Sequence, residues 1–221
     1  NCDNASMPVN SQPYLRPSTG EWSAEIEIKR SRFIGFVART ADEGAARSFI
    51  DAIASRYPDA RHHCTAFIVH VDEAQPIERS SDDGEPAGTA GQPMLEVLRG
   101  SGLLDVTVVV VRYFGGVKLG TGGLVRAYQD ATKEVLAQVT RVSHEPVDLF
   151  RVSVPHADAG RFEADIRTED VQVVNVDYAA QAEFTLGVPA GDGPQLESVV
   201  AKISGGNVDI HEAGSTWVDR P

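Results

Sequence analysis

Residues 111–128 constrain this chain most, because they run from an apolar strand through a glycine-rich loop into a helix. The preceding run Val106–Val111 is almost entirely β-branched, which is typical of a strand buried on both faces. Apolar residues then recur at helical spacing from Leu124 to Val139. The intervening glycines permit positive φ angles and bring backbone N–H groups close to a ligand. They are Gly115, Gly116, Gly120, Gly122 and Gly123.

This segment predicts an anion site. The helix N-terminus offers unpaired N–H groups and the positive end of the helix dipole. Arg112, Lys118 and Arg126 can add charge-assisted hydrogen bonds to a phosphate or a carboxylate. The sequence is neither a Walker A motif nor a dinucleotide-binding fingerprint. The alternative is a tight connection whose glycines only pack the backbone against a sheet.

A second loop crowds Asp82, Asp83 and Glu85 together with several glycines. These carboxylates are hard oxygen ligands that suit Mg²⁺. They are also able to pair with the cations of the glycine-rich loop and fix them toward a ligand. The simpler interpretation is local: Asp and Ser cap turns, Gly84 takes a positive φ, and Pro86 stiffens the exit. We predict no metal and no cofactor.

Adjacent His62, His63 and Cys64 cannot all converge on one ligand, because neighbouring strand residues point to opposite faces. A structural role is favoured, with His63 as the candidate to line a pocket beside the carboxylates as a general base. No serine-hydrolase elbow is present.

Composition limits the class of protein. No apolar run approaches the ~20 residues of a membrane helix, and residues 1–20 are polar, unlike a signal peptide. With only Cys2 and Cys64, no disulfide framework is possible. We therefore expect a cytoplasmic protein with reduced thiols and no membrane contact.

The net charge of −12 is unevenly distributed. Residues 1–141 hold 15 Lys and Arg against 18 Asp and Glu, whereas residues 142–221 hold 5 against 14. The first part is therefore able to carry a local basic face, and the second is a poor phosphate-binding surface.

Periodicity predicts an α+β chain. We expect a disordered tail over 1–20, an N-terminal domain over 21–142, a linker at 143–148 and a C-terminal domain over 149–218. In the N-terminal domain, capping boxes at Thr40–Glu43 and Thr89–Gln92 mark two helix starts, and the composition of residues 72–90 predicts a long loop. The C-terminal domain shows the order β-α-β-β-α-β, which is ferredoxin-like. Its expected elements are strand 149–154, helix 158–166, strands 171–178 and 182–188, helix 194–203 and a strand from 208.

The motifs at 81–93 and 111–128 closely resemble the signature of the IMPACT family, bacterial YigZ type. The resemblance covers about residues 21–139, and the remainder is similar to the second domain of bacterial members. It implies an N-terminal domain like domain 2 of ribosomal protein S5, and a two-domain pair that resembles domains IV and V of elongation factor G. Eukaryotic members regulate translation initiation.

Two hypotheses follow. The first is a non-enzymatic, translation-associated protein that contacts RNA, the ribosome or a translation-related protein through the glycine-rich basic loop. The second is an enzyme for a small phosphorylated or carboxylated substrate, with that loop as an anion cradle and the acidic loop for acid/base or metal chemistry.

Overall fold

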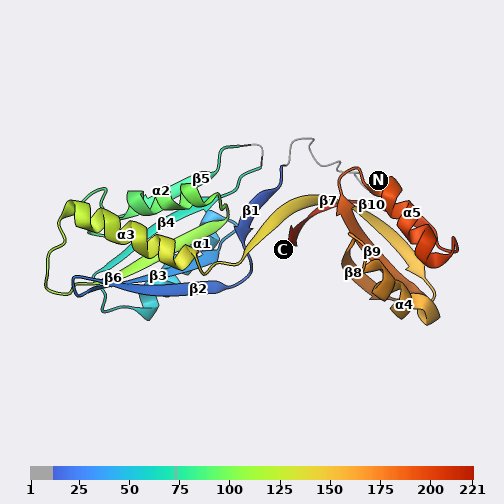
Figure 1. The fold of residues 1–221 in the computed structure, drawn as a ribbon, viewed down its shortest axis with the longest axis horizontal. Helices are drawn as coiled ribbons and strands as arrows, with labels where there is room; N and C mark the ends of the chain where they lie inside the picture. The colour runs from blue at the N-terminus through green and yellow to red at the C-terminus, as the bar shows by residue number, and fades with distance from the viewer. Residues whose placement is uncertain (1–11, 73) are drawn as a thin grey trace. The chain divides into compact units, whose positions relative to one another are not determined.

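The computed structural model describes residues 12–72 and 74–221, which form two compact units (Figure 1). The first spans Tyr14–Ser143 and the second spans His144–Arg220. The described residues contain five helices and two five-stranded sheets, which confirms the predicted α+β class. None of these helices combines the length and apolar character needed to cross a membrane.

The first unit is built on an antiparallel sheet with the strand order β2-β3-β6-β4-β5. In the centre, β6 pairs with β3 on one side and with β4 on the other. Val108 and Val110 of β6 face one hydrophobic core, and Val109 and Val111 face another. The expected burial on both faces is confirmed. The strands are β2 (Glu21–Ile28), β3 (Ser31–Arg39), β4 (His62–Val69), β5 (Ile77–Ser81) and β6 (Val106–Tyr113).

Helices cover both faces of this sheet. On one face lie α2 (Gly91–Ser101) and α3 (Thr121–Leu136), and on the other lies α1 (Glu43–Arg56). Gly35 of β3 lies beneath α3, where a Cβ atom would come within 2.9 Å of Val135 Cγ1. The missing side chain therefore lets α3 lie close to the sheet.

Two local predictions outside the candidate site are wrong in this unit. The predicted loop 72–90 contains β5, an edge strand whose polar residues show no apolar alternation. The N-cap of α1 is Asp42, which accepts a hydrogen bond from the Ala45 amide at 2.7 Å. Thr40 is instead buried, and its hydroxyl shares a 2.7 Å hydrogen bond with Thr107.

The predicted tail is also wrong where the structure describes it. β1 (Tyr14–Pro17) is a strand, and Leu15 bridges to Leu103. The Tyr14 hydroxyl donates to buried Asp105 at 2.8 Å. This segment of four residues is too short to show a sequence periodicity, and its partners lie far along the chain. Residues 1–11 of the predicted tail are outside the described residues.

The second unit follows the predicted order of elements. In its sheet β9 pairs with β7 and with β8, and β7 also pairs with β10 and with β1. β7 continues through residues 143–148, where we expected a linker. Pro146 lies just before the segment that pairs with β9, which begins at Val147, so it removes no hydrogen bond of that ladder. The elements are β7 (Arg141–Val154), α4 (His156–Ile166), β8 (Gln172–Tyr178), β9 (Ala182–Pro189), α5 (Gly193–Ser204) and β10 (Ile210–Arg220).

Candidate functional site

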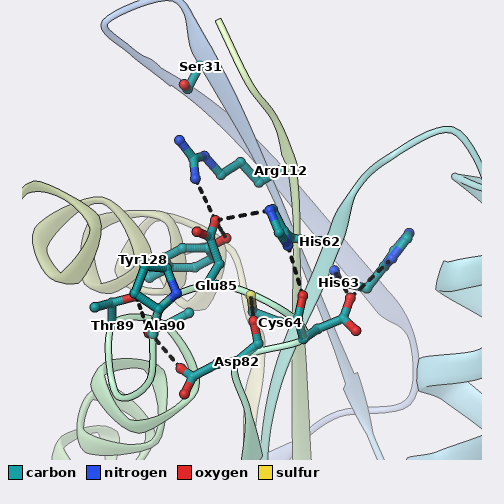
Figure 2. A network of polar contacts seen from close by, with 12 residues as sticks. Ser31, His62, His63, Cys64, Asp82, Glu85, Thr89, Ala90, Arg112 and Tyr128 are labelled. Atoms are coloured by element: carbon teal, nitrogen blue, oxygen red, sulfur yellow. Dashed lines mark hydrogen bonds and ion pairs between the residues drawn. The ribbon is translucent and has the colours of Figure 1, made fainter. Parts of the chain in front are cut away.

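A buried ion pair between Glu85 and Arg112 lies at the centre of a polar network in the first unit (Figure 2). Arg112 Nη1 donates to Glu85 Oε1 at 2.6 Å, and the Tyr128 hydroxyl donates to the same oxygen at 2.7 Å. The side chains of Arg112 and Glu85 are only 7% and 3% exposed. We expected, as one alternative, that a carboxylate of the acidic loop pairs with a cation of the glycine-rich segment, and Glu85 with Arg112 is such a pair.

The Arg112 side chain is buried, and its guanidinium is bound by groups inside the first unit. We expected β6 to end before Arg112, but the strand includes it. Its guanidinium lies 5.5 Å from the Phe33 ring centroid and 5.7 Å from that of Phe114, so the charge also interacts with two aromatic rings. A direct contact between Arg112 and a partner at the surface is therefore not what the geometry favours.

Tyr128 acts as a hydrogen-bond donor to the ion pair. It is fully buried on α3. Burial raises the pKa of its phenol far above the ordinary value, so the hydroxyl keeps its proton. The network therefore joins a strand, the acidic loop and a helix.

Asp82 caps α2 from a distance. Its carboxylate accepts the amides of Gly88 at 2.8 Å, Gly91 at 2.9 Å and Ala90 at 3.0 Å. Burial alone would raise the pKa of Asp82, but these three hydrogen bonds outweigh it and hold the pKa below its usual value. The predicted capping box at Thr89–Gln92 is absent, because Asp82 supplies the acceptor and no side chain of the helix does so.

The histidines divide as strand alternation requires. His62 Nδ1 donates to the Asp83 carbonyl at 2.8 Å, and its Nε2 lies 4.0 Å from Glu85 Oε1. The His63 ring turns away and donates to the Tyr57 carbonyl at 2.9 Å, keeping a 3.6 Å approach to the Asp83 carboxylate. His62, not His63, is thus the histidine beside the buried glutamate.

Cys64 lies on the same face of β4 as His62, and its buried thiol donates to the Asp82 carbonyl at 3.0 Å. Burial raises the pKa of this thiol to about 12. The residue is therefore a protonated structural donor rather than a nucleophile.

Gly115 locks the glycine-rich loop against the turn between β2 and β3. Its amide donates to the Ser31 hydroxyl at 3.1 Å, and a Cβ atom at Gly115 would overlap the Arg30 carbonyl group. The turn consists of Lys29 and Arg30, with φ angles of 47° and 67°. Both angles are positive, as in a type I′ hairpin, where Asn and Gly are the usual residues.

The remainder of the loop faces solvent. Gly116 and Gly120 have φ angles of 86° and 74°, and Gly122 and Gly123 lie in the first turn of α3. Four exposed cations make no hydrogen bond or ion pair within the described residues: Lys29, Arg30, Lys118 and Arg126. Phe114 is 53% and Val117 is 41% exposed. We refer to these four cations with Phe114 and Val117 as the loop surface.

Within the described residues, no group of three or more His, Cys, Asp or Glu side chains is arranged to hold a metal ion. The three carboxylates of the acidic loop instead accept hydrogen bonds from protein donors. Asp82 accepts from backbone amides, Glu85 accepts from Arg112, and Asp83 accepts from the His63 amide at 2.6 Å.

Comparison with known proteins assigns the family. The model of the Impact N-terminal domain matches residues 29–136, and that of a domain of unknown function, DUF1949, matches residues 152–207. The IMPACT family member YigZ of Escherichia coli is 39% identical over 184 residues, which cover 83% of this chain and 90% of that protein. The chain belongs to the IMPACT family.

Two further relatives agree. The IMPACT family member YvyE of Bacillus subtilis is 35% identical and covers 89% of each chain. A crystal structure titled as that of a hypothetical protein is 37% identical, with a TM-score of 0.60, and covers 91% of this chain and 97% of that one.

Sequence reasoning missed three residues of this IMPACT protein's candidate site. Lys29 and Arg30 reach the glycine-rich loop only through the hairpin turn, and Lys-Arg is not a typical turn sequence. His62 lies directly opposite Arg112 in the β4–β6 register. Knowledge of that register would have selected His62 over His63.

Gly115→Ala should destabilise the protein by about 2–3 kcal/mol, because the new methyl group overlaps rigid backbone. Gly122→Ala is the matched control, since no atom lies within 4 Å of its added Cβ. It should be neutral or stabilising by up to about 1 kcal/mol. Urea unfolding measures both, and equal effects would contradict the tight packing of Gly115.

Asp82→Asn should cost about 1–2 kcal/mol at pH 7, since one amide oxygen cannot replace a carboxylate that accepts three amides. The pKa of Asp82 is lowered by folding, so its contribution is present above the unfolded pKa of about 3.9 and is lost as the pH falls through the folded value. The deficit of the variant should therefore shrink below about pH 4.

Exposed Asp51→Asn serves as the control for this titration and should leave stability unchanged at either pH. A deficit of Asp82→Asn that stays constant down to about pH 2 would show that the carboxylate charge is not what caps α2.

Proposed function

We propose that this protein is a non-enzymatic, translation-associated binding protein that contacts an anionic partner through the loop surface. The partner is RNA, most simply within the ribosome, or the acidic face of a translation-related protein. The link to translation comes from the IMPACT family, whose eukaryotic members regulate translation initiation. We place this activity in the cytoplasm.

The observation that carries the proposal is the separation of charges in the first unit. The charge of Glu85 is paired with Arg112 in the interior. Three cations stay exposed without an acidic partner in the described residues: Lys29, Arg30 and Lys118. Unpaired cations on ordered loops are suited to phosphate oxygens. Phe114 adds an exposed aromatic ring, which suits stacking on an unpaired base.

The turn conformation supports the same conclusion. Lys29 and Arg30 hold positive φ angles, which cost about 1 kcal/mol or more for each such residue. Asn and Gly would make this hairpin more stable. The presence of two cations in this strained position, where Asn and Gly are preferred, supports a requirement for their charge.

Fold assignments complete the proposal. We assign the first unit to the class of domain 2 of ribosomal protein S5, and the second to the ferredoxin-like class, on the element order β-α-β-β-α-β, in which β9 pairs with β7 and β8, and β7 also pairs with β10. The pair then resembles domains IV and V of elongation factor G. Such a pair of domains fits a protein that meets the ribosome.

The enzymatic alternative has less support. Asp82 and Glu85 are engaged by backbone amides and by Arg112, and the Cys64 thiol is protonated. These groups hold the loop in place, which leaves few free acid/base side chains near the glycines.

The double variant Lys29→Asn/Arg30→Gly tests this proposal directly. It should raise the thermal unfolding temperature, because it installs the preferred type I′ residues, and it should weaken co-sedimentation with ribosomes. If both residues meet RNA phosphates, the slope of log affinity against log salt should become shallower by about 0.7–0.9 for each phosphate that no longer has a cationic partner.

Arg161→Ala/Lys202→Ala removes two exposed cations from the second unit and is the charge-matched control; it should bind as the wild type does. Lys118→Ala/Arg126→Ala should weaken binding like the turn variant. Binding to ribosomes but not to isolated RNA would assign the partner to a protein face. Wild-type protein that binds neither, at about 50 mM salt, would contradict the proposal.

A further inference from the structure

A groove between α2 and α3 has the size of a ligand site and contains none of the residues of the loop surface. Its volume is about 520 Å³, within the range of small-molecule pockets. Figure 1 shows the two helices side by side on one face of the sheet. The lining residues all belong to the first unit.

The floor of the groove is apolar. Val97 of α2 and Leu136 of α3 contribute aliphatic surface, and Ala137 continues it past the end of α3. Gly100 lies on the α2 side, and no atom comes within 4 Å of a Cβ built there. The absence of a side chain at Gly100 therefore leaves open the space that a bulkier residue would fill.

Cations border this floor. Arg141 donates to the Ser101 carbonyl at a long 3.4 Å, and Lys133 lies 3.9 Å from the Asp130 carboxylate. Both side chains are exposed, so these weak contacts are readily exchanged for a stronger anionic partner. An anion here has two charge-assisted donors available.

The preceding helical turn carries one acidic residue, Glu96, and one neutral residue, Gln129. Glu96 and Gln129 also line the groove, and each lies four residues before Gly100 and Lys133 on its own helix. Four residues correspond to about one turn, or ~6 Å along the helix axis. Of the two lining cations, Lys133 lies in the last turn of α3 and Arg141 lies at the start of β7, so the positive charge of the groove gathers near the C-terminal end of α3. An anionic head group belongs there.

We propose that this groove binds a small amphiphilic carboxylate: an acid with an aliphatic or aromatic body. The body lies on Val97, Leu136 and Ala137 in the space left by Gly100. The carboxylate pairs with Lys133 and Arg141. The combination of an apolar floor with two weakly engaged cations selects this class over neutral lipids and over cations.

The test compares octanoate, 1-octanol and octylammonium by calorimetry on the full-length protein. Octanoate should bind at least about tenfold more tightly than octanol, the effect expected of a charge-assisted hydrogen bond, and octylammonium should bind least. Lys133→Ala/Arg141→Ala should remove the advantage of octanoate over octanol. Glu96→Gln should tighten octanoate binding, because it removes a like charge.

Gly100→Leu locates the site. The substitution replaces glycine by a strong helix former in an open position, so the protein should stay folded while octanoate binding is lost. Gly100→Ala, with a smaller side chain, should retain most binding. The thermal unfolding temperature checks that both variants are folded.

Equal affinity for octanoate and octanol, or octanoate binding unchanged in Gly100→Leu, would overturn the proposal. So would the absence of any binding to the wild type up to about 1 mM octanoate. Ribosome binding through the loop surface is measured separately, and its outcome does not depend on this groove.

Discussion

The buried ion pair of Glu85 and Arg112 is the interaction on which the candidate site depends. Removing both charges from water is costly, and the cost is offset only where the geometry is close and other polar atoms are satisfied. Here the separation is 2.6 Å, and Tyr128 supplies a second donor to the same carboxylate oxygen. The buried Arg112 Nε has no hydrogen-bond partner within the described residues, so part of the cost is not offset. The pair thereby ties the acidic loop to β6 and α3, which flank the glycine-rich loop on either side.

The two loops form one structure with a division of roles. The acidic loop is anchored to the fold through its polar groups: Asp82 caps α2, and the carbonyls of Asp82 and Asp83 accept hydrogen bonds from Cys64 and His62. The glycine-rich loop is fixed at Gly115 and then opens to solvent. The carboxylates of Asp82 and Glu85 are engaged by protein donors, and the cations of the loop surface remain exposed. A chain of net charge −12 thus keeps a local face suited to anions.

Local periodicity predicts most of the elements in both units, because each buried face repeats at the period of its helix or strand. The long-range features were not predictable in this way. β1 is a short strand whose partners lie far along the chain, and Asp82 caps a helix that begins nine residues later. β5 pairs with the preceding strand β4, but its exposed polar residues carry no apolar alternation. A charged residue such as Arg112 is expected at the surface from sequence alone. It is buried here because it pairs with Glu85, which lies 27 residues earlier in the chain. The choice between His62 and His63 depends on strand register, which no pattern within β4 specifies.

A double-mutant cycle on Arg112 and Glu85 tests the central claim most directly. The free energy of urea unfolding is measured for the wild type, Arg112→Met, Glu85→Leu and the double variant. Each single variant leaves an unpaired buried group and should cost about 3–5 kcal/mol, whereas the double variant should recover much of that stability. We predict a coupling energy of at least about 2 kcal/mol. Effects that add within about 0.5 kcal/mol would contradict the account and return Arg112 to the set of residues available for a ligand.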